Sequence, residues 1–345
     1  MNRDVWIVRG DGTRTPDRLG DPVGSVGSQG EVRQLEGDPG RIAKIVHHAG
    51  DLSDRVRLML RDRPGWVTRA GRPVVAWPDA AVHRSDDGRL IGYAAPKLAP
   101  PRFVPLPLLF NPAVRARLLP AATWTWWLEV AEDLARTVHA AHQRDHVIGD
   151  LAPANIFVSA AGTACLIDVD GWQLRDETTG TDLLCAFSRP EYTAPEELGK
   201  PARPRDPASD RWALAVLVAQ LLSLGFHPYG GVPFDASGPV EEVDNVRARR
   251  CRPLGARVRA PRGAVPADVL PPVLRRRLAE ALDDGYDRPE ARPDASAWAA
   301  GLAYSRRRLT TCERSARHVH AVERAGCPWC SMAAGGGRDP FREDL

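Results

Sequence analysis

The sequence predicts an α+β fold, in which a small antiparallel sheet with one helix precedes a larger helical region and a short cysteine-containing extension. Three observations support this fold class. Short apolar runs separated by turn residues dominate the chain up to Pro96, apolar residues at helical spacing dominate the region after residue 107, and three of the six cysteines lie near the C-terminus. A length of 345 residues accommodates two lobes and an appendage. We therefore divide the chain into residues 1–96, 97–308 and 309–345, and we expect the last of these to end in a disordered tail.

The apolar run at residues 42–46 predicts a buried strand that carries Lys44. The chain has 44 arginines but three lysines, so a lysine at this position is exceptional. A buried ammonium is costly without a partner, and its compact charge suits a phosphate contact from a strand better than a guanidinium does. We interpret Lys44 as a phosphate-binding residue. The alternative is an edge-strand lysine that extends its charge into water.

A glycine-rich turn at residues 24–32 comes shortly before that strand. Glycine turns are common in plain hairpins, so the interpretation rests on the order along the chain. A loop whose backbone amides cover phosphates is expected just ahead of the strand with the phosphate-binding lysine. The nucleotide-contacting positions expected in this turn are Ser25, Gly27, Gly30 and Val32.

The rest of the first region is predicted as a short amphipathic helix at residues 51–60 and strands near 74–77 and 90–93. A proline-rich linker at residues 96–107 follows. Apolar residues then recur at helical spacing, and we interpret this aromatic stripe as core packing rather than a cofactor site. The stripe consists of Trp124, Trp127, Leu128, Ala131, Leu134, Ala135, Val138 and His142.

Two acidic positions flank one amide in the middle of the chain. Residues 149–155 read Gly-Asp-Leu-Ala-Pro-Ala-Asn, and Asp168 follows Asn155 by thirteen positions. In phosphoryl transfer one carboxylate orients the attacking hydroxyl, while an amide oxygen and a second carboxylate hold magnesium on the phosphates. This layout is typical of a Mg-ATP phosphotransfer site, with Asp150 as the orienting carboxylate and Asn155 and Asp168 as the metal ligands.

In this order the motifs resemble the serine/threonine protein kinases of eukaryotic type that bacteria carry, over residues 18–308. Lys44 matches the strand lysine of that family, Asp150 its catalytic-loop aspartate, and Asn155 and Asp168 its magnesium ligands. Residues 192–196, Tyr-Thr-Ala-Pro-Glu, resemble the motif that closes the activation segment. The resemblance implies a two-lobed protein kinase-like fold, with ATP and Mg²⁺ as cofactors and Mn²⁺ as a possible substitute.

Two further positions extend the resemblance. Asp210 begins an apolar helix, as in the large lobe of kinases, where the matching aspartate braces the catalytic loop. Arg292 resembles the arginine that pairs with the glutamate of the Ala-Pro-Glu motif, here Glu196. Both are implied to be support residues, whose loss affects the interior of the fold more than the chemistry.

The chain is similar to a bacterial subfamily in which Asp-Val-Asp, here residues 168–170, replaces Asp-Phe-Gly. Members often carry helix-hairpin-helix DNA-binding modules and are associated with a vWA-domain protein and a PP2C-type phosphatase. The resemblance therefore implies those two proteins as partners. We expect no DNA-binding module in this chain, which ends at Leu345.

Three departures from the family pattern affect the expected mechanism. Gly149 replaces the arginine that receives a phosphorylated residue, so phosphorylation at Thr178, Thr179, Thr181 or Ser188 is not expected to be required. Asp170 replaces a flexible glycine, which should restrict inactive conformations. The helix at residues 51–60 has no glutamate to pair with Lys44, and Asp54 is the candidate in its place.

The C-terminal extension contains one Cys-Pro-Trp-Cys string, preceded by another cysteine and a histidine. This spacing is typical of a structural tetrahedral zinc knuckle, in which four protein ligands leave no position for water. A redox dithiol or incidental cysteines are the alternatives, and His320 could replace His318. The expected ligands are Cys312, His318, Cys327 and Cys330.

Composition narrows the function classes. A net charge of +3 gives no general case for nucleic-acid binding, and the seven arginines between Arg247 and Arg262 are interpreted as a solvated loop rather than a polyanion patch. No secretory signal or membrane-spanning run is recognised, so a cytoplasmic protein is expected.

The leading hypothesis is an ATP- and Mg-dependent kinase that phosphorylates serine or threonine of an unidentified protein in bacterial signalling. The alternatives are a nucleotide-binding pseudokinase scaffold and a small-molecule kinase of the aminoglycoside phosphotransferase type, whose catalytic loop also contains Gly-Asp-Leu before the asparagine. The peptide-docking region around Glu196 and the Asp210 helix count against the last of these.

Overall fold

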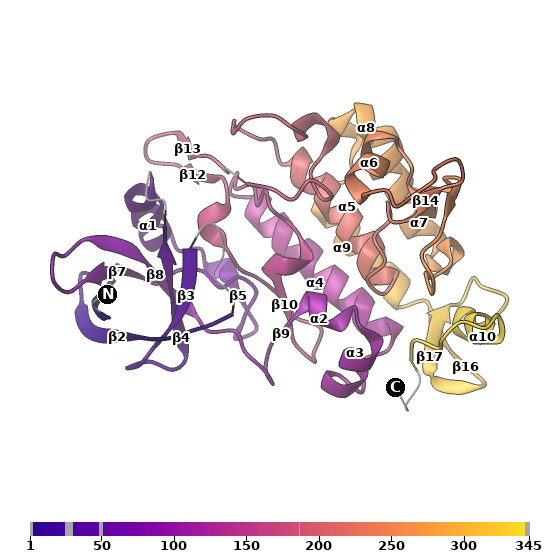
Figure 1. The fold of residues 1–345 in the computed structure, drawn as a ribbon, viewed down its shortest axis with the longest axis horizontal. Coiled ribbons are helices and arrows are strands. Elements are labelled where there is room, and N and C mark those ends of the chain that lie inside the picture. The colour runs from indigo at the N-terminus through magenta and orange to yellow at the C-terminus, as the bar shows by residue number, and fades with distance from the viewer. Residues whose placement is uncertain (1–2, 25–29, 48–50, 186, 342–345) are drawn as a thin grey trace.

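The strands and helices of this chain are segregated along its length, as an α+β fold requires. The computed structural model describes residues 3–24, 30–47, 51–185 and 187–341. Strands dominate up to Pro96 and helices dominate from Leu106 to Arg306, while a small unit of two strands and one helix follows. Figure 1 shows the strand-rich region at one end of the molecule and the C-terminal unit at the other.

The N-terminal strands form a closed barrel in the order β1-β2-β3-β4-β8-β7, with every neighbouring pair antiparallel. The sequence prediction of a small antiparallel sheet missed β1 and the closure. Alternate residues fill the interior, including Val5, Ile7, Ala43 and Val82. The strands are β1 Asp4–Arg9, β2 Arg14–Pro22, β3 Gly30–Leu35, β4 Arg41–Val46, β7 Ala80–Arg84 and β8 Leu90–Pro96.

Helix α1 (Leu52–Arg61) confirms the predicted helix and places one face against the core. The predicted strand at residues 74–77 is wrong, because Val75 makes a single parallel bridge to Leu166 instead of joining the barrel. The strands on either side of β8 are β4 and β7. A short hairpin of β5 Thr68–Arg69 and β6 Arg72–Pro73 follows α1.

The helical region is built around α4 (Trp124–His142) and α5 (Ala208–Leu222), which pack together in one large apolar core. The predicted aromatic stripe is confirmed as core, since Trp124, Trp127 and Leu134 are fully buried. The other helices of the region are α2 Leu106–Leu109, α3 Pro112–Leu118, α6 Glu242–Arg247, α7 Pro272–Ala279, α8 Gly285–Asp287 and α9 Ala295–Arg306.

Short strands lie between the helices of this region. A three-stranded sheet has the order β11-β10-β9, β12 and β13 form a small hairpin, and β14 pairs with β15 across a segment that contains α6. Their bounds are β9 Val104–Pro105, β10 Ile156–Val158, β11 Ala164–Leu166, β12 Leu174–Asp176, β13 Thr181–Leu183, β14 Val232–Pro233 and β15 Val258–Arg259.

The C-terminal unit consists of the hairpin β16 (Leu309–Cys312) and β17 (Ser315–Ala321) followed by α10 (Pro328–Ala334). Trp329 is fully buried, with its ring 6.0 Å from that of Trp124 and 4.9 Å from that of Phe341. The structure therefore differs from the disordered tail expected in this extension, because the chain packs back onto the unit as far as Phe341. In the described part of the chain, no helix has the length and apolar character that crossing a membrane requires.

Candidate active site

A hairpin brings two of the predicted site residues to the same place. Asn155 immediately precedes β10 and Asp168 follows β11, and these strands pair antiparallel with Ile156 opposite Leu166. The backbone N–H of Ile167 donates to the carbonyl of Asn155 at 3.0 Å, which extends the pairing by one step. The amide of Asn155 and the carboxylate of Asp168 therefore lie at the same end of one hairpin, although thirteen residues separate them in sequence.

Lys44 reaches this end of the hairpin from the barrel. Its ammonium forms an ion pair with Asp168 and a second one with Asp170, at 2.7 Å between Nζ and Oδ1. Asp168 has a φ of 68°, a left-handed conformation that is uncommon for a residue with a side chain, and a short 3-10 turn follows at Val169–Gly171. This reversal of the chain places both carboxylates on the same ammonium.

Asp54 is not the partner of Lys44, contrary to the sequence prediction. Its side chain is 61% exposed on the outer face of α1 and pairs with Arg57 at 3.1 Å. Residues three and four apart share a helix face, so this pairing is local to α1. The acid that accompanies Asp168 at Lys44 is Asp170, which comes from the same turn as the predicted metal ligand rather than from the helix.

The cluster of Lys44, Asp168 and Asp170 has two carboxylates for one ammonium. Burial raises the pKa of Asp168, and the neighbouring Asp170 carboxylate raises it further, although Lys44 acts in the opposite direction. Burial opposes the charged form of Lys44, but Asp170 and Asp168 outweigh burial and raise its pKa. The cluster is therefore short of positive charge, which is the electrostatic condition for binding a divalent cation.

Tyr93 completes the contacts of Asp170. Its hydroxyl donates to Asp170 Oδ1 at 2.5 Å, the same oxygen that accepts from Lys44. The ring is buried on β8, directly opposite Lys44 in the strand register. Burial, followed by the charges of Asp170 and Asp168, raises the pKa of Tyr93 well above its usual value, so Tyr93 remains a neutral donor. Sequence reasoning missed this residue.

Helix α1 is attached to the site by Arg55 rather than by an acid. The Arg55 guanidinium donates to the carbonyl of Trp172 at 2.8 Å and to that of Leu184, and its Nε donates to Asp51 at 2.7 Å. Only 7% of Arg55 is exposed. The helix and the segment after Asp170 are thus joined by a buried cation, and Lys44 is held without any contribution from α1.

The carboxylate of Asp150 is bonded on both oxygens. Oδ1 accepts the backbone N–H of Arg189 at 3.0 Å, while Oδ2 accepts the Asn155 amide at 2.8 Å and forms an ion pair with the Arg189 side chain. Asn155 also donates to the carbonyl of Asp150 at 2.9 Å. With its amide nitrogen used in this way, Asn155 keeps its amide oxygen as the group that can bind a metal. Arg189 was not among the predicted site residues.

Gly149 is required by space and by backbone conformation. Its φ is 72°, and a Cβ added there would lie 2.3 Å from Sγ of Cys185. Both the backbone conformation and the lack of space therefore exclude a side chain at this position. This gives a physical reason why Gly149 stands where the family pattern has an arginine. Arg205 lies next to this glycine, donates to its carbonyl at 3.2 Å and reaches Ser188 at 3.4 Å.

Asp210 holds the loop that carries Asp150. Its carboxylate accepts the backbone N–H groups of Ile148 at 2.7 Å and Gly149 at 2.8 Å, and it contacts Nε2 of His142 at 3.0 Å. Asp210 is 1% exposed, so these bonds are shielded from water. Its position at the start of α5 lets a helix of the large core fix the conformation of the loop.

Arg292 and Glu196 form a bidentate ion pair, with distances of 2.6 and 2.7 Å. The Arg292 guanidinium also donates to the carbonyls of Gly285 and Ala208 and lies 5.2 Å from the centre of the Trp212 ring. Four hydrogen bonds, two of them to a carboxylate, therefore hold this buried cation. The contact expected from the sequence is therefore present, and it connects the segment at Glu196 to the helical core.

The glycine-rich turn is described in part. Ser25 and Gly27 lie outside the described residues, so their expected nucleotide contacts are untested. A Cβ on Gly30 would lie 2.2 Å from the carbonyl oxygen of Ile45, which shows that close strand packing alone requires glycine there. Val32 is directly opposite Lys44 in the β3–β4 register and is partly exposed.

A second group of polar side chains gathers in the C-terminal unit. The ligand atoms of Cys312, His318, Cys327 and Cys330 all lie within 4.8 Å of one another. Nδ1 of His318 is 3.5 Å from Sγ of Cys327 and 3.4 Å from Sγ of Cys330. This group could hold a metal ion, as the spacing predicted, and it includes His318 rather than His320, which contacts the carbonyl of Ala321 instead.

Asp339 orients the histidine of this group. Its Oδ2 lies 2.8 Å from Nε2 of His318, and its Oδ1 accepts the N–H of Phe341 at 2.9 Å. A carboxylate on the far nitrogen is the usual arrangement for a metal-binding histidine, because it directs Nδ1 toward the metal. Asp339 lies in the segment that was expected to be disordered, so the sequence analysis did not identify it.

The arginine run from Arg247 to Arg262 is only partly solvated. Arg249 forms an exposed ion pair with Asp287 at 2.5 Å, and Arg247 pairs with Asp244 at 3.0 Å. Arg252 instead donates to the backbone carbonyl of Val265 at 2.9 Å and is partly buried. Several of these arginines therefore have structural partners, which accords with the loop interpretation more than with a continuous polyanion patch.

Two relatives from Escherichia coli match most of the length of this chain. The chain is 29% identical over 341 residues to Protein kinase YegI of Escherichia coli strain K12, a match that covers 96% of this chain and 51% of the relative. The protein of the same name from Escherichia coli O157:H7 is 29% identical over 315 residues, covering 89% and 47%. The chain thus spans about half the length of these relatives.

A shorter match involves Protein kinase 2 of Dictyostelium discoideum, 31% identical over 99 residues, or 29% of this chain and 20% of the relative. No family model matches the sequence. The similarity to proteins named as kinases supports a kinase-like family for this chain.

Proposed function

We propose that this chain is an ATP- and magnesium-dependent phosphotransferase, a serine/threonine protein kinase of bacterial signalling with the two-lobed kinase fold. The observation that carries the proposal is the Lys44 cluster, where two carboxylates share one buried ammonium beside the loop of Asp150 and Asn155. Such an excess of negative charge fits a bound magnesium ion and the phosphates that it accompanies.

Each residue then has a role that follows from its position. Lys44 would contact the phosphates from the barrel, and Asp168 with the amide oxygen of Asn155 would hold magnesium, which neutralises charge on the phosphates. Asp150 would orient the substrate hydroxyl and accept its proton. Arg189 occupies this carboxylate in the structure, so it has to make room for the hydroxyl. A PP2C-type phosphatase and a vWA-domain protein are the partners that we propose.

The test is phosphate transfer from ATP labelled on the γ-phosphate to a generic protein substrate. We expect Asp150→Asn to reduce the rate by about 10³-fold, a common scale for losing an acid–base group, while nucleotide binding persists. Asp54→Asn is a matched control, because Asp54 lies on the outer face of α1, and it should leave the rate unchanged. Wild-type protein that binds ATP but transfers no phosphate would overturn the enzyme proposal.

That outcome would favour the second candidate, a nucleotide-binding pseudokinase that acts as a scaffold. The specific observation in its favour is the ion pair between Asp150 and Arg189, which blocks the catalytic carboxylate. The Arg189→Ala variant separates the two candidates. It should raise or preserve transfer by a kinase whose arginine is displaced in each cycle, and it should produce no transfer in a scaffold.

We also propose that the C-terminal cluster holds one structural zinc ion, bound by Cys312, His318, Cys327 and Cys330. Three thiolates and one imidazole are a frequent zinc-binding set, and four protein ligands leave no site for catalysis. Metal analysis of the purified chain should give about one equivalent of zinc. The His318→Ala variant should lose it, while the His320→Ala control should retain it. Less than about half an equivalent in the wild type contradicts this assignment.

A further inference from the structure

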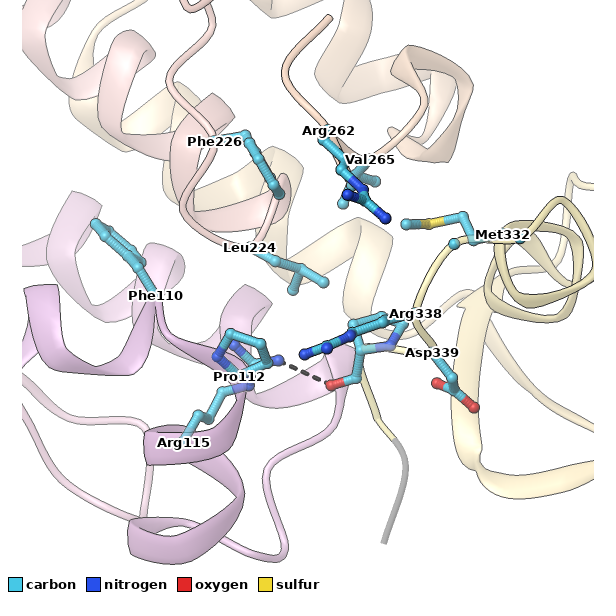
Figure 2. Close-up of a pocket in the computed structure, with 14 residues that line it drawn as sticks. Phe110, Pro112, Arg115, Leu224, Phe226, Arg262, Val265, Met332, Arg338 and Asp339 are labelled. Atoms are coloured by element: carbon cyan, nitrogen blue, oxygen red, sulfur yellow. Dashed lines mark hydrogen bonds between the residues drawn. The ribbon is translucent and has the colours of Figure 1, made fainter. Parts of the chain in front are cut away.

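A cavity of about 460 Å³ lies between the helical region and the C-terminal unit (Figure 2). It is separate from the candidate active site, since none of the residues of that site lines it. Its volume falls in the range of small-molecule sites in proteins. Apolar side chains from four segments form most of its wall, namely Phe110, Pro112, Leu224, Phe226, Val265 and Met332.

One wall of the cavity contains a buried cation, Arg115, that has no counter-ion among the described residues. Arg115 on α3 is 3% exposed and donates to two backbone carbonyls, those of Leu109 at 2.9 Å and Pro340 at 2.8 Å. The dashed line in Figure 2 marks the bond to the carbonyl of Pro340. Among the described residues, no carboxylate pairs with Arg115.

A guanidinium in such surroundings is electrostatically incomplete. Its charge lies near the rings of Trp127 and Phe341, at 5.6 and 5.9 Å, which compensate it weakly. Burial lowers the pKa of Arg115 to about 10, because the charged form loses its hydration. It remains charged at neutral pH, and an anion placed next to it would reverse the cost of burial.

Two more arginines, Arg262 and Arg338, line the rim of the same cavity and are exposed. Within the part of the chain that the structure describes, neither forms an ion pair. Among the described residues that line the cavity, Asp339 is the one acid, and both of its oxygens are already used by His318 and the N–H of Phe341. As far as the structure describes the chain, the cavity therefore combines three guanidinium groups with apolar walls and has no carboxylate free to neutralise them.

We propose that this cavity binds a small carboxylate with an apolar body. The carboxylate lies toward Arg115 and Arg338, because a planar guanidinium can donate two parallel hydrogen bonds to the oxygens of a carboxylate. The apolar body lies against Phe226 and Met332. A nucleotide or a free phosphate fits less well, since a multiply charged group would be desolvated against walls that are mostly apolar.

The position of the site gives the ligand a structural effect. Arg115 and Phe226 belong to the helical region, whereas Met332 and Arg338 belong to the C-terminal unit. A ligand that contacts both would hold the two together, and it would stabilise the folded chain in proportion to its occupancy. This inference is independent of phosphate transfer.

Titration calorimetry on the full chain tests the proposal with three probes: decanoate, decan-1-ol and acetate. Decanoate should bind at one site, at least about ten-fold more tightly than decan-1-ol. The reason is that hydrogen bonds from the arginines to a charged carboxylate contribute more binding free energy than hydrogen bonds to a neutral hydroxyl. Acetate, which lacks the apolar body, should bind more weakly still. Equal affinity for decanoate and decan-1-ol would overturn the role of the arginines.

Variants locate the site without relying on Arg115, whose replacement could unfold the chain. Arg338→Gln should weaken decanoate binding about ten-fold, and Met332→Trp, which fills the cavity, should abolish it. Arg257→Gln is the matched control, because Arg257 is an exposed arginine of the same loop as Arg262 but does not line the cavity. Unchanged binding to a folded Met332→Trp protein would place the ligand elsewhere and refute the proposal.

Discussion

Two buried cations of this molecule, Arg292 and Lys44, meet carboxylates in opposite ways. Arg292 has one carboxylate, Glu196, and donates to both of its oxygens, while two further hydrogens go to backbone carbonyls. Lys44 has two carboxylates, and its single charge cannot balance both. The first cluster is neutral and complete, whereas the second is negative and open to a further cation.

This contrast separates support from function within one chain. A complete ion pair gains nothing from a ligand, so it can only hold the fold. An incomplete cluster is less stable on its own, and such sites are where proteins give up stability for activity. The Arg115 cavity extends the contrast with the opposite sign, since there a cation has no anion among the residues that the structure describes. Four predictions test it.

The largest effect is expected for Arg292→Met. This change leaves the Glu196 carboxylate without its partner in a partly buried place and should lower the free energy of unfolding by about 3 kcal/mol. Urea denaturation followed by circular dichroism measures it. Arg247→Met is the control, because its ion pair with Asp244 is more than half exposed on both sides and should contribute at most about 0.5 kcal/mol. Equal losses in the two variants would contradict the distinction.

Next in size is the effect of Asp170→Asn on activity. The change removes one of the two anchors of Lys44, and a misplaced phosphate-binding group should reduce kcat/KM by about 100-fold. Steady-state phosphate transfer measures this, with Asp54→Asn as the comparison. A loss in the Asp54 variant and none in the Asp170 variant would show that the helix acid anchors Lys44 after all.

A smaller effect is expected for Tyr93→Phe. The change keeps the buried ring and removes the hydroxyl that donates to Asp170 at 2.5 Å. Loss of one hydrogen bond to a charged acceptor should lower kcat/KM by about ten-fold. Tyr286→Phe provides the control, since that hydroxyl makes a 3.3 Å contact with Arg247 far from the cluster. Identical kinetics for wild type and Tyr93→Phe would show that Asp170 needs no second donor.

The smallest effect is a gain in stability for Asp168→Asn, by about 0.5 to 1 kcal/mol near pH 8 without nucleotide or magnesium. Burial raises the pKa of Asp168 above 3.8. Between pH 3.8 and the folded-state pKa, the folded chain therefore binds the proton more tightly than the unfolded chain does. The stability of the wild type therefore falls as pH rises through the folded-state pKa.

The Asn variant has no such loss, so its advantage should be larger near pH 8 than near pH 4. Thermal unfolding at the two pH values measures it. A wild type that is more stable than the variant near pH 8 would show that Asp168 is fully compensated by Lys44.

Sequence reasoning identified the residues whose types and spacing carry information, and it failed where a role depends on contacts between distant segments. Lys44, Asp150, Asn155 and Asp168 are recognisable because a strand, a loop and a hairpin follow one another in a fixed order. The Cys/His group was likewise predicted by spacing, and the structure gathers its four ligand atoms.

The partner of Lys44 could not be predicted, since it depends on the left-handed turn at Asp168, which brings Asp170 back onto the ammonium. Arg189 and Asp339 are missing from the prediction for a related reason. Each reaches its partner across 39 or 21 residues, and no local pattern marks either. Closure of the barrel also escaped prediction, because β1 lies outside the motifs that organised the interpretation.

Helix α4 begins at Trp124, against the Trp329 ring of the C-terminal unit, and ends at His142, which contacts Asp210 behind the loop of Asp150. Its 19 residues make a rod about 28 Å long. At physiological ionic strength, salt screens the interaction between exposed charges over roughly 8 Å, and the helix is longer than that distance. A change of charge at the Cys/His cluster would thus be screened before it reached the loop of Asp150, whereas a displacement of Trp329 would be passed along a stiff helix. If the two ends of this molecule are coupled, the coupling is therefore expected to be mechanical.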